Sequence, residues 1–487
     1  MKPSIRGVAA AALSLVVLAS LASSQAIATT HKGAPFNART YLKTHGYLPL
    51  RGVATLKAMK AYAAAQAAKL HPAANTPSSA AAPTIGSSWK GVVNQGFTPP
   101  DPNGAIGPNS YVEIVNTNIA IYQRNGSLVA TSLMSALTGH SNGSDPMVLY
   151  DPGTQRFYYN IWDTTQATMQ WGFSKNANPT SLPGSFCNYS ASFGYQTTNF
   201  PDYPKLGQSG KFLMIGVNFY PTITSQVATR SDLLWITKPQ GRDPITTCPA
   251  ASTFKNGKFT DLRNQDGSQA FTPVPAIQTD PNKNGFVVAS SDTECPPMPC
   301  PNGNLITVYG LRPSSSDPTV PQLSPPHSIT RGTYTGPPDA PQKGSSFDID
   351  TLDGRLSHAV SAVDPVNNGG KVAIWTAQAI LGGAGSEDVW YEINPLPLSS
   401  PSIVQQGTIS SNSLYVWNAA VSPDRTFNTS GQAAHGGTMV AGFTTSSANA
   451  FPAIQMVSKV GAGAQSAFVL VKQSATADLD FGCAQLG

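Results

Sequence analysis

Six stretches of the chain repeat one pattern, and this repetition constrains the fold more than any other feature. Each stretch begins at a polar residue or a proline, passes a turn rich in Gly, Asn or Pro, and continues into Val, Ile, Phe, Tyr or Trp. The stretches are residues 101–122, 145–162, 202–219, 275–291, 358–377 and 418–447. Repeated strand units of this kind predict an all-β fold of radially arranged sheets, most simply a β-propeller.

The spacing of the stretches fits seven blades better than six, with eight as an alternative. The strand-rich part runs from Ser87 to about Ser474, and seven blades would take roughly 55 residues each, with two long insertions. We expect the terminal stretch 467–472 to pair with residues 89–93 and close the ring, because closure removes exposed strand edges.

The composition agrees with a turn-rich β protein. Only 11% of the residues are charged, and the chain has 43 Gly and 41 Pro. The apolar content of 40% argues against disorder. The net charge of +5 is small and the Lys and Arg residues are scattered, so we expect no nucleic-acid partner.

The N-terminus predicts secretion. Lys2 and Arg6 precede an apolar run over residues 8–21, and Ala26-Ile27-Ala28 fits a cleavage site. We therefore expect a signal peptide over residues 1–28, a helical N-terminal arm over 29–71, an Ala/Pro/Ser linker over 72–86 and the propeller over 87–487. No later stretch is apolar enough to span a membrane, so the mature chain is expected to be extracellular, periplasmic or in the cell envelope.

Five cysteines are disulfide candidates in a secreted chain: Cys187, Cys248, Cys295, Cys300 and Cys483. Cys295 and Cys300 flank a short proline-rich segment and are expected to close a small loop. Cys187 and Cys248 form the second expected pair, and Cys483 would then be the unpaired cysteine.

Several longer motifs resemble a family of secreted bacterial β-propeller-like proteins. The motifs are PPDPNGAIGPN (99–109), SDPMVLYD (144–151), FPDYPKLG (200–207), VWYE (389–392) and QQGT (405–408). The resemblance implies a propeller fold and secretion over most of residues 87–463. The family has no established reaction or ligand, so it implies no catalytic residues.

Aspartates recur near the turns of the repeats, at Asp101, Asp145, Asp202, Asp280 and Asp364. In the structural interpretation their side chains accept main-chain N–H bonds in tight turns. In the functional interpretation they converge on the central channel, where a carboxylate pair could act on a glycosidic bond. Asp145 and Asp202 are the catalytic candidates, with Tyr203 and Lys205, because a Tyr/Lys pair could bind or deprotonate a uronic sugar.

A second acidic group could bind calcium, which takes six to eight oxygen ligands. It comprises Asp348, Asp350 and Asp353, although an ion pair of Asp350 with Arg355 is the structural alternative.

Candidate ligand-binding residues are Arg355, His358 and Trp417. Trp417 precedes the turn at Asn418 and is expected to reach the channel mouth, although most strand tryptophans are core residues. An isolated histidine such as His358 is more often a packing residue.

Two functions remain open from the sequence, beside a purely structural role in the cell envelope that fits the composition equally. The first is an extracellular or cell-surface binding protein for a glycan or a protein, which fits the lack of a strong catalytic motif. The alternative is a carbohydrate-active hydrolase or lyase with paired Asp residues at the channel mouth, although this rests on fold-level analogy. The sequence does not decide whether the protein is an enzyme.

Overall fold

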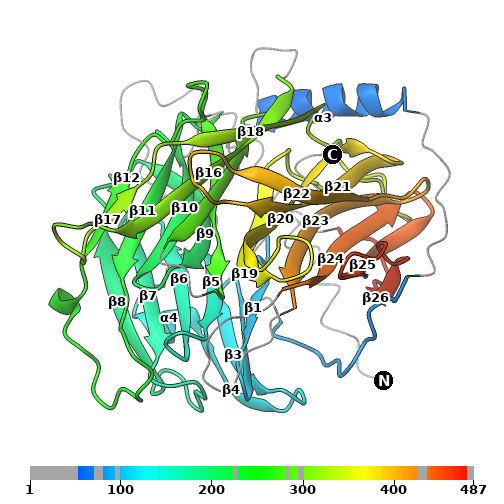
Figure 1. The fold of residues 1–487 in the computed structure, drawn as a ribbon. Helices are drawn as coiled ribbons and strands as arrows, with labels where there is room; N and C mark the ends of the chain where they lie inside the picture. The colour runs from blue at the N-terminus through cyan, green and yellow to red at the C-terminus, as the bar shows by residue number, and fades with distance from the viewer. Residues whose placement is uncertain are drawn as a thin grey trace, which may run out of the picture.

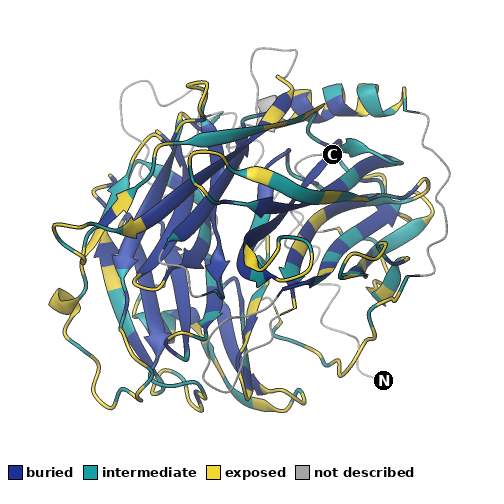
Figure 2. Cartoon of the chain, in the orientation of Figure 1, coloured by how far each residue is buried: buried dark blue, intermediate teal, exposed yellow. Residues whose placement is uncertain are grey.

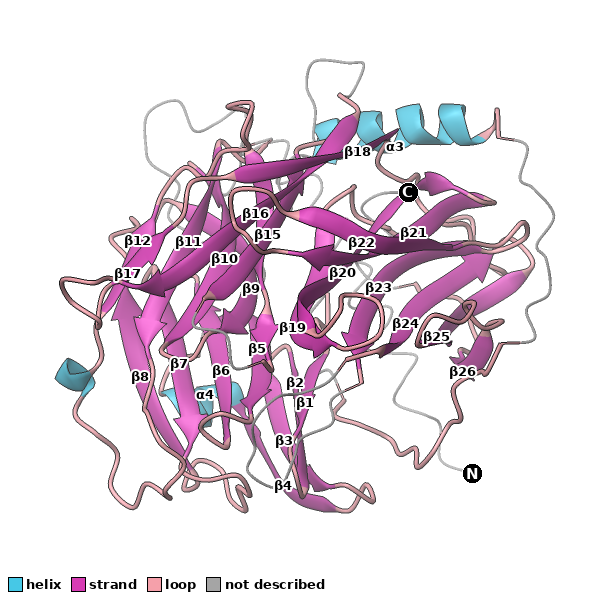
Figure 3. Cartoon of the chain, viewed as in Figure 1, coloured by secondary structure: helices cyan, strands magenta, loops and turns pink. Residues whose placement is uncertain are grey.

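The computed structural model describes residues 53–70, 80–93, 99–141, 143–222, 225, 227–280, 284–293, 301–424 and 436–479. Within these residues the chain forms 26 strands, the helices α3 (Val53–Ala67) and α4 (Met134–Thr138), and the short 3-10 helix η1 (Ala251–Thr253). The all-β prediction is therefore confirmed (Figure 3). Helix α3 lies where the sequence predicts the helix of the N-terminal arm.

The strands form six antiparallel units, each beginning with its innermost strand. The first unit is β1 (Asn103–Ile106), β2 (Ser110–Val115), β3 (Asn118–Gln123) and β4 (Leu128–Leu133). The second is β5 (Gly143–Asp151), β6 (Arg156–Asp163), β7 (Thr168–Ser174) and β8 (Phe186–Ser192). The third is β9 (Phe200–Gln208), β10 (Phe212–Tyr220), β11 (Arg230–Thr237) and β12 (Asn256–Phe259).

The fourth unit is β13 (Ala270–Pro275), β15 (Gly285–Ser291) and β16 (Gly303–Pro313), with β17 (Pro321–Leu323) and β18 (His327–Tyr334) both paired to β16. The fifth is β19 (Leu356–Asp364), β20 (Lys371–Gly382), β21 (Gly385–Asn394) and β22 (Ser402–Ile409). The sixth is β23 (Tyr415–Pro423), β24 (Thr438–Ser447), β25 (Ala450–Val460) and β26 (Val469–Gln473).

Seven blades are not confirmed, because the described strands form six units. Equal division of the chain length assigned too few residues to each unit. The extra residues lie in long connections, notably between β11 and β12 and between β18 and β19.

The units follow one another around the molecule in a propeller-like arrangement (Figure 1). An apolar core lies between each successive pair of units from the first to the sixth. Both faces of the inner sheets are therefore buried, which explains their near-continuous apolar strands (Figure 2). Burial of this apolar surface holds the units together.

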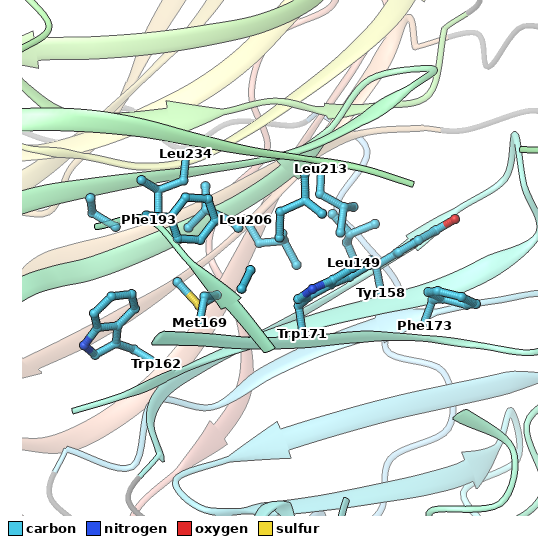
Figure 4. Close-up of a cluster of buried hydrophobic side chains, with 14 of the residues drawn as sticks. Leu149, Tyr158, Trp162, Met169, Trp171, Phe173, Phe193, Leu206, Leu213 and Leu234 are labelled. Atoms are coloured by element: carbon cyan, nitrogen blue, oxygen red, sulfur yellow. The ribbon is translucent and has the colours of Figure 1, made fainter. Parts of the chain in front are cut away.

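The core between the second and third units shows how two sheets interlock (Figure 4). Tyr158 and Trp171 from the second sheet share this cluster with Leu213 and Leu234 from the third. The Trp171 ring also stacks on Tyr189 at a centroid distance of 5.0 Å. This pair joins the neighbouring strands β7 and β8, and it stabilises the second sheet beyond the area that it buries.

Strand β14 (Ile277–Gln278) follows the innermost strand β13 and lies between β9 and β19. It pairs in parallel with both β9 and β19, so the third and fifth units belong to one nine-stranded sheet. The Gln208 side chain extends this pairing by donating to the Gln278 carbonyl (2.7 Å) and accepting from the Gln278 amide (2.7 Å). Hydrogen bonds therefore join β14 to the end of β9 and to the middle of β19.

An N-terminal strap (residues 80–93) joins the sixth unit to the first. At one end Ser458 Oγ donates to the Ala81 carbonyl (2.7 Å). At the other end the Trp89 ring packs on Tyr111 and Tyr122, at centroid distances of 5.8 and 6.0 Å. Residues 89–93 are not a strand and β26 pairs with β25, so the predicted strand closure is wrong and the strap spans this junction.

The Cys187–Cys248 disulfide is confirmed, with a Cα–Cα distance of 5.5 Å. It attaches the connection between β11 and β12 to the outer strand β8 of the second unit. The Arg156 guanidinium supports this attachment by donating to the Gly241 carbonyl (2.8 Å). Cys295, Cys300 and Cys483 lie outside the described residues.

A disulfide fits an oxidising compartment. Within the described part of the chain, no helix is long and apolar enough to cross a membrane.

We predict that replacing both Cys187 and Cys248 with Ser lowers the free energy of unfolding by about 2–5 kcal/mol, since the bridge restricts the unfolded chain. Chemical denaturation under oxidising conditions measures the change. Equal stability of the double variant and the unmodified protein would show that the noncovalent contacts of the β11–β12 connection suffice.

We also predict that Trp89→Ala destabilises the protein by about 1–3 kcal/mol, because this half-buried ring fixes the strap to the first unit. Lys90→Ala is the matched control, because Lys90 is exposed on the same strap. Thermal denaturation of both variants measures the difference. A Trp89→Ala protein as stable as the control would mean that the strap does not hold the junction.

Candidate functional site at the propeller axis

The innermost strands of successive units contact one another from β1 to β23, so they surround the axis. We call the end at which these strands begin the entry face. Near it, the innermost strands repeat one backbone irregularity. A bulge interrupts the pairing of β5, β9, β13, β19 and β23 with their neighbours.

A residue with positive φ marks most of these positions. It is Asp145 in β5 (φ 56°), Tyr203 in β9 (φ 55°), Thr272 in β13 (φ 48°) and Asn418 in β23 (φ 59°), and Asp101 just before β1 has φ 45°. The first three strand residues and Asp101 each precede a proline. Proline lacks an N–H donor, so it suits a bulge where ladder pairing is interrupted.

The left-handed conformation is strained for residues other than Gly, at about 1–3 kcal/mol each, and such strain concentrates at functional sites. Here the surrounding sheets impose this conformation near the entry face of consecutive units. The bulge redirects the side chain at this position.

Three aspartates and a lysine meet where the first three units converge. The Asp101 carboxyl is hydrogen-bonded to that of Asp145 and lies within the electrostatic influence of Asp202 and Lys205. We call Asp101, Asp145, Asp202 and Lys205 the axial cluster.

Asn116 links the two hydrogen-bonded carboxyls. Its side-chain amide donates to Asp101 Oδ2 (2.6 Å), and its Oδ1 accepts from the Asp145 amide (3.2 Å). Ser144 Oγ also donates to Asp145 Oδ1 (2.5 Å).

The pKa of Asp101 is raised from 3.8 to about 8, mainly by burial. The charges of Asp145 and Asp202 contribute to this rise, whereas the Lys205 ammonium opposes it. Asp101 therefore keeps its proton at neutral pH and can donate it in a hydrogen bond to Asp145. Like charges held this close do not both ionise freely.

Cations surround the adjacent Tyr203 ring. Lys205 Nζ lies 3.8 Å from the ring centroid, and the Arg355 guanidinium carbon lies 4.4 Å from it. Arg355 also lies 5.1 Å from the Phe271 ring centroid. The fourth and fifth units thus contribute side chains beside the axial cluster.

Arg355 is buried and paired with Asp353. Its Nε donates to Asp353 Oδ1 (2.8 Å), and its Nη2 pairs with Oδ2. Burial opposes the charge of Arg355, but the Asp353 carboxylate outweighs burial and raises the pKa of Arg355 above its ordinary value. The bidentate pair fixes the guanidinium plane against Tyr203.

The structure brings five sequence-predicted residues into one region: Asp145, Asp202, Tyr203, Lys205 and Arg355. It adds Asp101 as the carboxyl with the displaced pKa and Asn116 as its support. The Asp-Pro step shared by residues 101–102 and 145–146 is a sequence signal for Asp101. Asn116 follows β2 and has no comparable signal.

Of the other recurring aspartates, Asp364 follows the structural interpretation, whereas Asp280 bonds to side chains. Asp364 Oδ1 accepts the amides of Val366 (2.6 Å) and Asn367 (3.0 Å), as in an Asx-turn. Asp280 accepts a hydrogen bond from Ser361 Oγ (2.6 Å).

Trp417 does not reach the channel mouth. It is 2% exposed and packs in the core with Ala340 and Ala379, because its side chain points between the sheets. The residue that the β23 bulge exposes is its neighbour Asn418. His358 lies at the β19 bulge and is half-buried, and its binding role stays a prediction.

The three calcium candidates do not share one site. Asp350 pairs with Lys60 and Asp353 pairs with Arg355, while Asp348 is exposed. Among the described residues, no group of three or more His, Cys, Asp or Glu side chains could hold a metal ion. The predicted ion pair of Asp350 with Arg355 is also replaced by these two pairs.

Comparison with known proteins leaves the family open. No family model matches the chain, and no curated protein matches it in sequence.

Similar solved structures include enzymes that act on sugars. A Penicillium chrysogenum α-L-arabinanase complexed with arabinobiose has 8% identity over 75% of this chain and 95% of that chain, with a TM-score of 0.38. An α-L-arabinofuranosidase from Fusarium graminearum has 10% identity over 72% and 90%, with a TM-score of 0.36. An exo-β-1,3-galactanase from Clostridium thermocellum has 11% identity over 80% and 81%, with a TM-score of 0.32. Identities and TM-scores this low do not indicate a function for this chain. The propeller-like arrangement follows from the strand pairing.

The raised pKa of Asp101 predicts a pH-dependent contribution to stability. Between its unfolded value near 3.8 and its folded value of about 8, the native state binds more protons than the unfolded state. The free energy of unfolding contributed by Asp101 therefore falls as pH rises through this window. We predict that Asp101→Asn, which cannot titrate, reduces the loss of thermal stability between pH 5 and pH 9.

Asp317→Asn is the control for this measurement. Asp317 is exposed, and its hydrogen bonds with Thr319 lower its pKa to about 2, so it stays ionised throughout the window. Melting temperatures of all three proteins across the pH series test the prediction. Parallel curves for Asp101→Asn and the unmodified protein would contradict the protonated state of Asp101.

Proposed function

We propose that the protein is a secreted binding protein that takes an extracellular glycan at the axial cluster. The observation that carries this proposal is the convergence of Asp101, Asp145, Asp202 and Lys205 from three consecutive units. All four side chains are half-buried rather than enclosed in the core, so they combine fixed positions with access.

The chemistry of the axial cluster suits a ligand rich in hydroxyl groups. An ionised carboxylate accepts several hydrogen bonds, a protonated carboxyl both donates and accepts, and an ammonium donates three. A sugar hydroxyl donates and accepts, so it can satisfy all of these groups. Sites with a few fixed polar groups beside aromatic rings are typical of small-ligand recognition.

The signal-like N-terminus and the Cys187–Cys248 disulfide support an extracellular ligand. The resemblance to secreted bacterial β-propeller-like proteins points the same way. A cell-surface protein is the alternative partner within this proposal.

A specific observation favours a second function, a carbohydrate-active hydrolase or lyase. Asp101 holds a proton at neutral pH beside carboxyl groups that can ionise. General acid–base catalysis uses such a pair, with one protonated carboxyl group as the acid and one ionised carboxylate as the base or nucleophile. Asp101 and Asp145 are hydrogen-bonded and therefore much closer than the roughly 5–9.5 Å of glycosidase pairs. In this proposal Asp202 is the partner carboxylate of one of them.

A glycan array combined with product assays on plant and bacterial polysaccharides tests both functions. We predict that Asp202→Asn weakens glycan binding at least about ten-fold, because a charged hydrogen bond contributes about 1.5–3 kcal/mol. Asp317→Asn, a surface change of the same type, should bind like the unmodified protein.

Binding without new reducing ends or unsaturated products supports the binding protein, and product formation that needs Asp202 supports the enzyme. Undiminished binding and turnover by a folded Asp202→Asn protein would exclude the axial cluster as the glycan site. Failure of the unmodified protein to bind any glycan would reject the glycan proposal.

A further inference from the structure

We propose that Lys60, on the N-terminal helix α3, is a positioning residue of the axial site. In this proposal its ammonium holds the segment 350–355 in the conformation that places Arg355 against Tyr203. The inference rests on the proposed function in taking this region as the ligand site.

Helix α3 lies on the entry face. Its partners belong to the connection between β18 and β19, which leads into the start of the innermost strand β19. Figure 1 shows α3 beside β18 and β21. The helix thus lies on the same face as the axial cluster.

The Lys60 ammonium is buried, with 5% of the residue exposed. It donates to Thr351 Oγ1 (2.8 Å), the Pro337 carbonyl (3.2 Å) and the Leu352 carbonyl. It also pairs with Asp339 Oδ1 (3.1 Å) and Asp350 Oδ1 (3.2 Å).

A buried ammonium is retained only when such partners compensate for its lost hydration. Met59 and Ala63 are the other buried side chains described on α3 and add apolar contact. Lys60 supplies a polar attachment of the helix to the β18–β19 connection.

Lys60 holds a strained backbone position. Leu352 has φ 60°, a conformation that a leucine seldom adopts. The Leu352 carbonyl accepts from Lys60, and its amide donates to Asp350 Oδ1 (2.8 Å), which also pairs with Lys60. Lys60 thus fixes Leu352 directly and through Asp350.

The residues that follow Leu352 connect it to the axial cluster. Asp353 Oδ1 accepts both the amide (2.9 Å) and the Nε (2.8 Å) of Arg355. The Gly354 amide donates to Thr293 Oγ1 (3.3 Å). Arg355 then contacts the Tyr203 ring, which also contacts Lys205 of the axial cluster. A continuous series of contacts therefore leads from α3 to the cluster.

Hydrogen exchange of the full-length protein tests the inference without a ligand. Lys60→Met keeps the apolar stem and removes the ammonium. We predict that the amides of Leu352, Gly354 and Arg355 then exchange roughly ten-fold faster or more, because their segment opens locally. Amides of β3, in the first unit, should exchange at the unmodified rate.

Lys69→Met is the matched control. It removes the same charge from an exposed position that follows α3 and whose side chain contacts Gln66. It should leave exchange at residues 352–355 unchanged. If Lys60→Met does not fold, Thr351→Val removes one oxygen partner of Lys60 and should accelerate the same amides.

Faster exchange of α3 alone, with residues 352–355 unchanged, would overturn the inference and leave Lys60 as a helix anchor. If the glycan array identifies a ligand, Lys60→Met should weaken its binding while Lys69→Met does not. Absence of any glycan ligand would reject the proposed function, and the exchange result would still decide the positioning role.

Discussion

The structure depends on the burial of both faces of nearly every sheet. The sheet β9–β12 has apolar side chains on both faces. It is therefore stable only between two neighbouring sheets. Repetition of this constraint produces a ring, and the ring brings the innermost strands together at one axis. The junction of the sixth and first units is different, because the N-terminal strap spans it.

The strained bulges connect this architecture to the candidate site. Sheet packing over-determines the backbone near the entry face, so positive φ values persist at Asp145 and Tyr203. The same packing restricts solvation, which raises the pKa of Asp101. Stable sheets therefore maintain a group of carboxyls that would repel one another in water.

The sequence predicted much of the fold because its signals are local. Apolar runs and turns identified the strands, and the spacing of the repeats indicated a radial arrangement. The predicted number of units is not confirmed, since length alone cannot separate a blade from a long connection such as residues 335–355. Trp417 was misplaced for a related reason: a strand pattern does not say which face meets another sheet.

The sequence by itself determined the strands and the Asp-Pro steps that bend the innermost strands. It named Cys187–Cys248 as an expected pair, which the structure confirms. Tertiary structure alone decided that Asp101, rather than Asp280 or Asp364, joins Asp145, because that depends on which strand ends meet at the axis. It also decided that Lys60 neutralises Asp350. The two residues are 290 positions apart in the sequence, and no local pattern encodes a contact over such a separation.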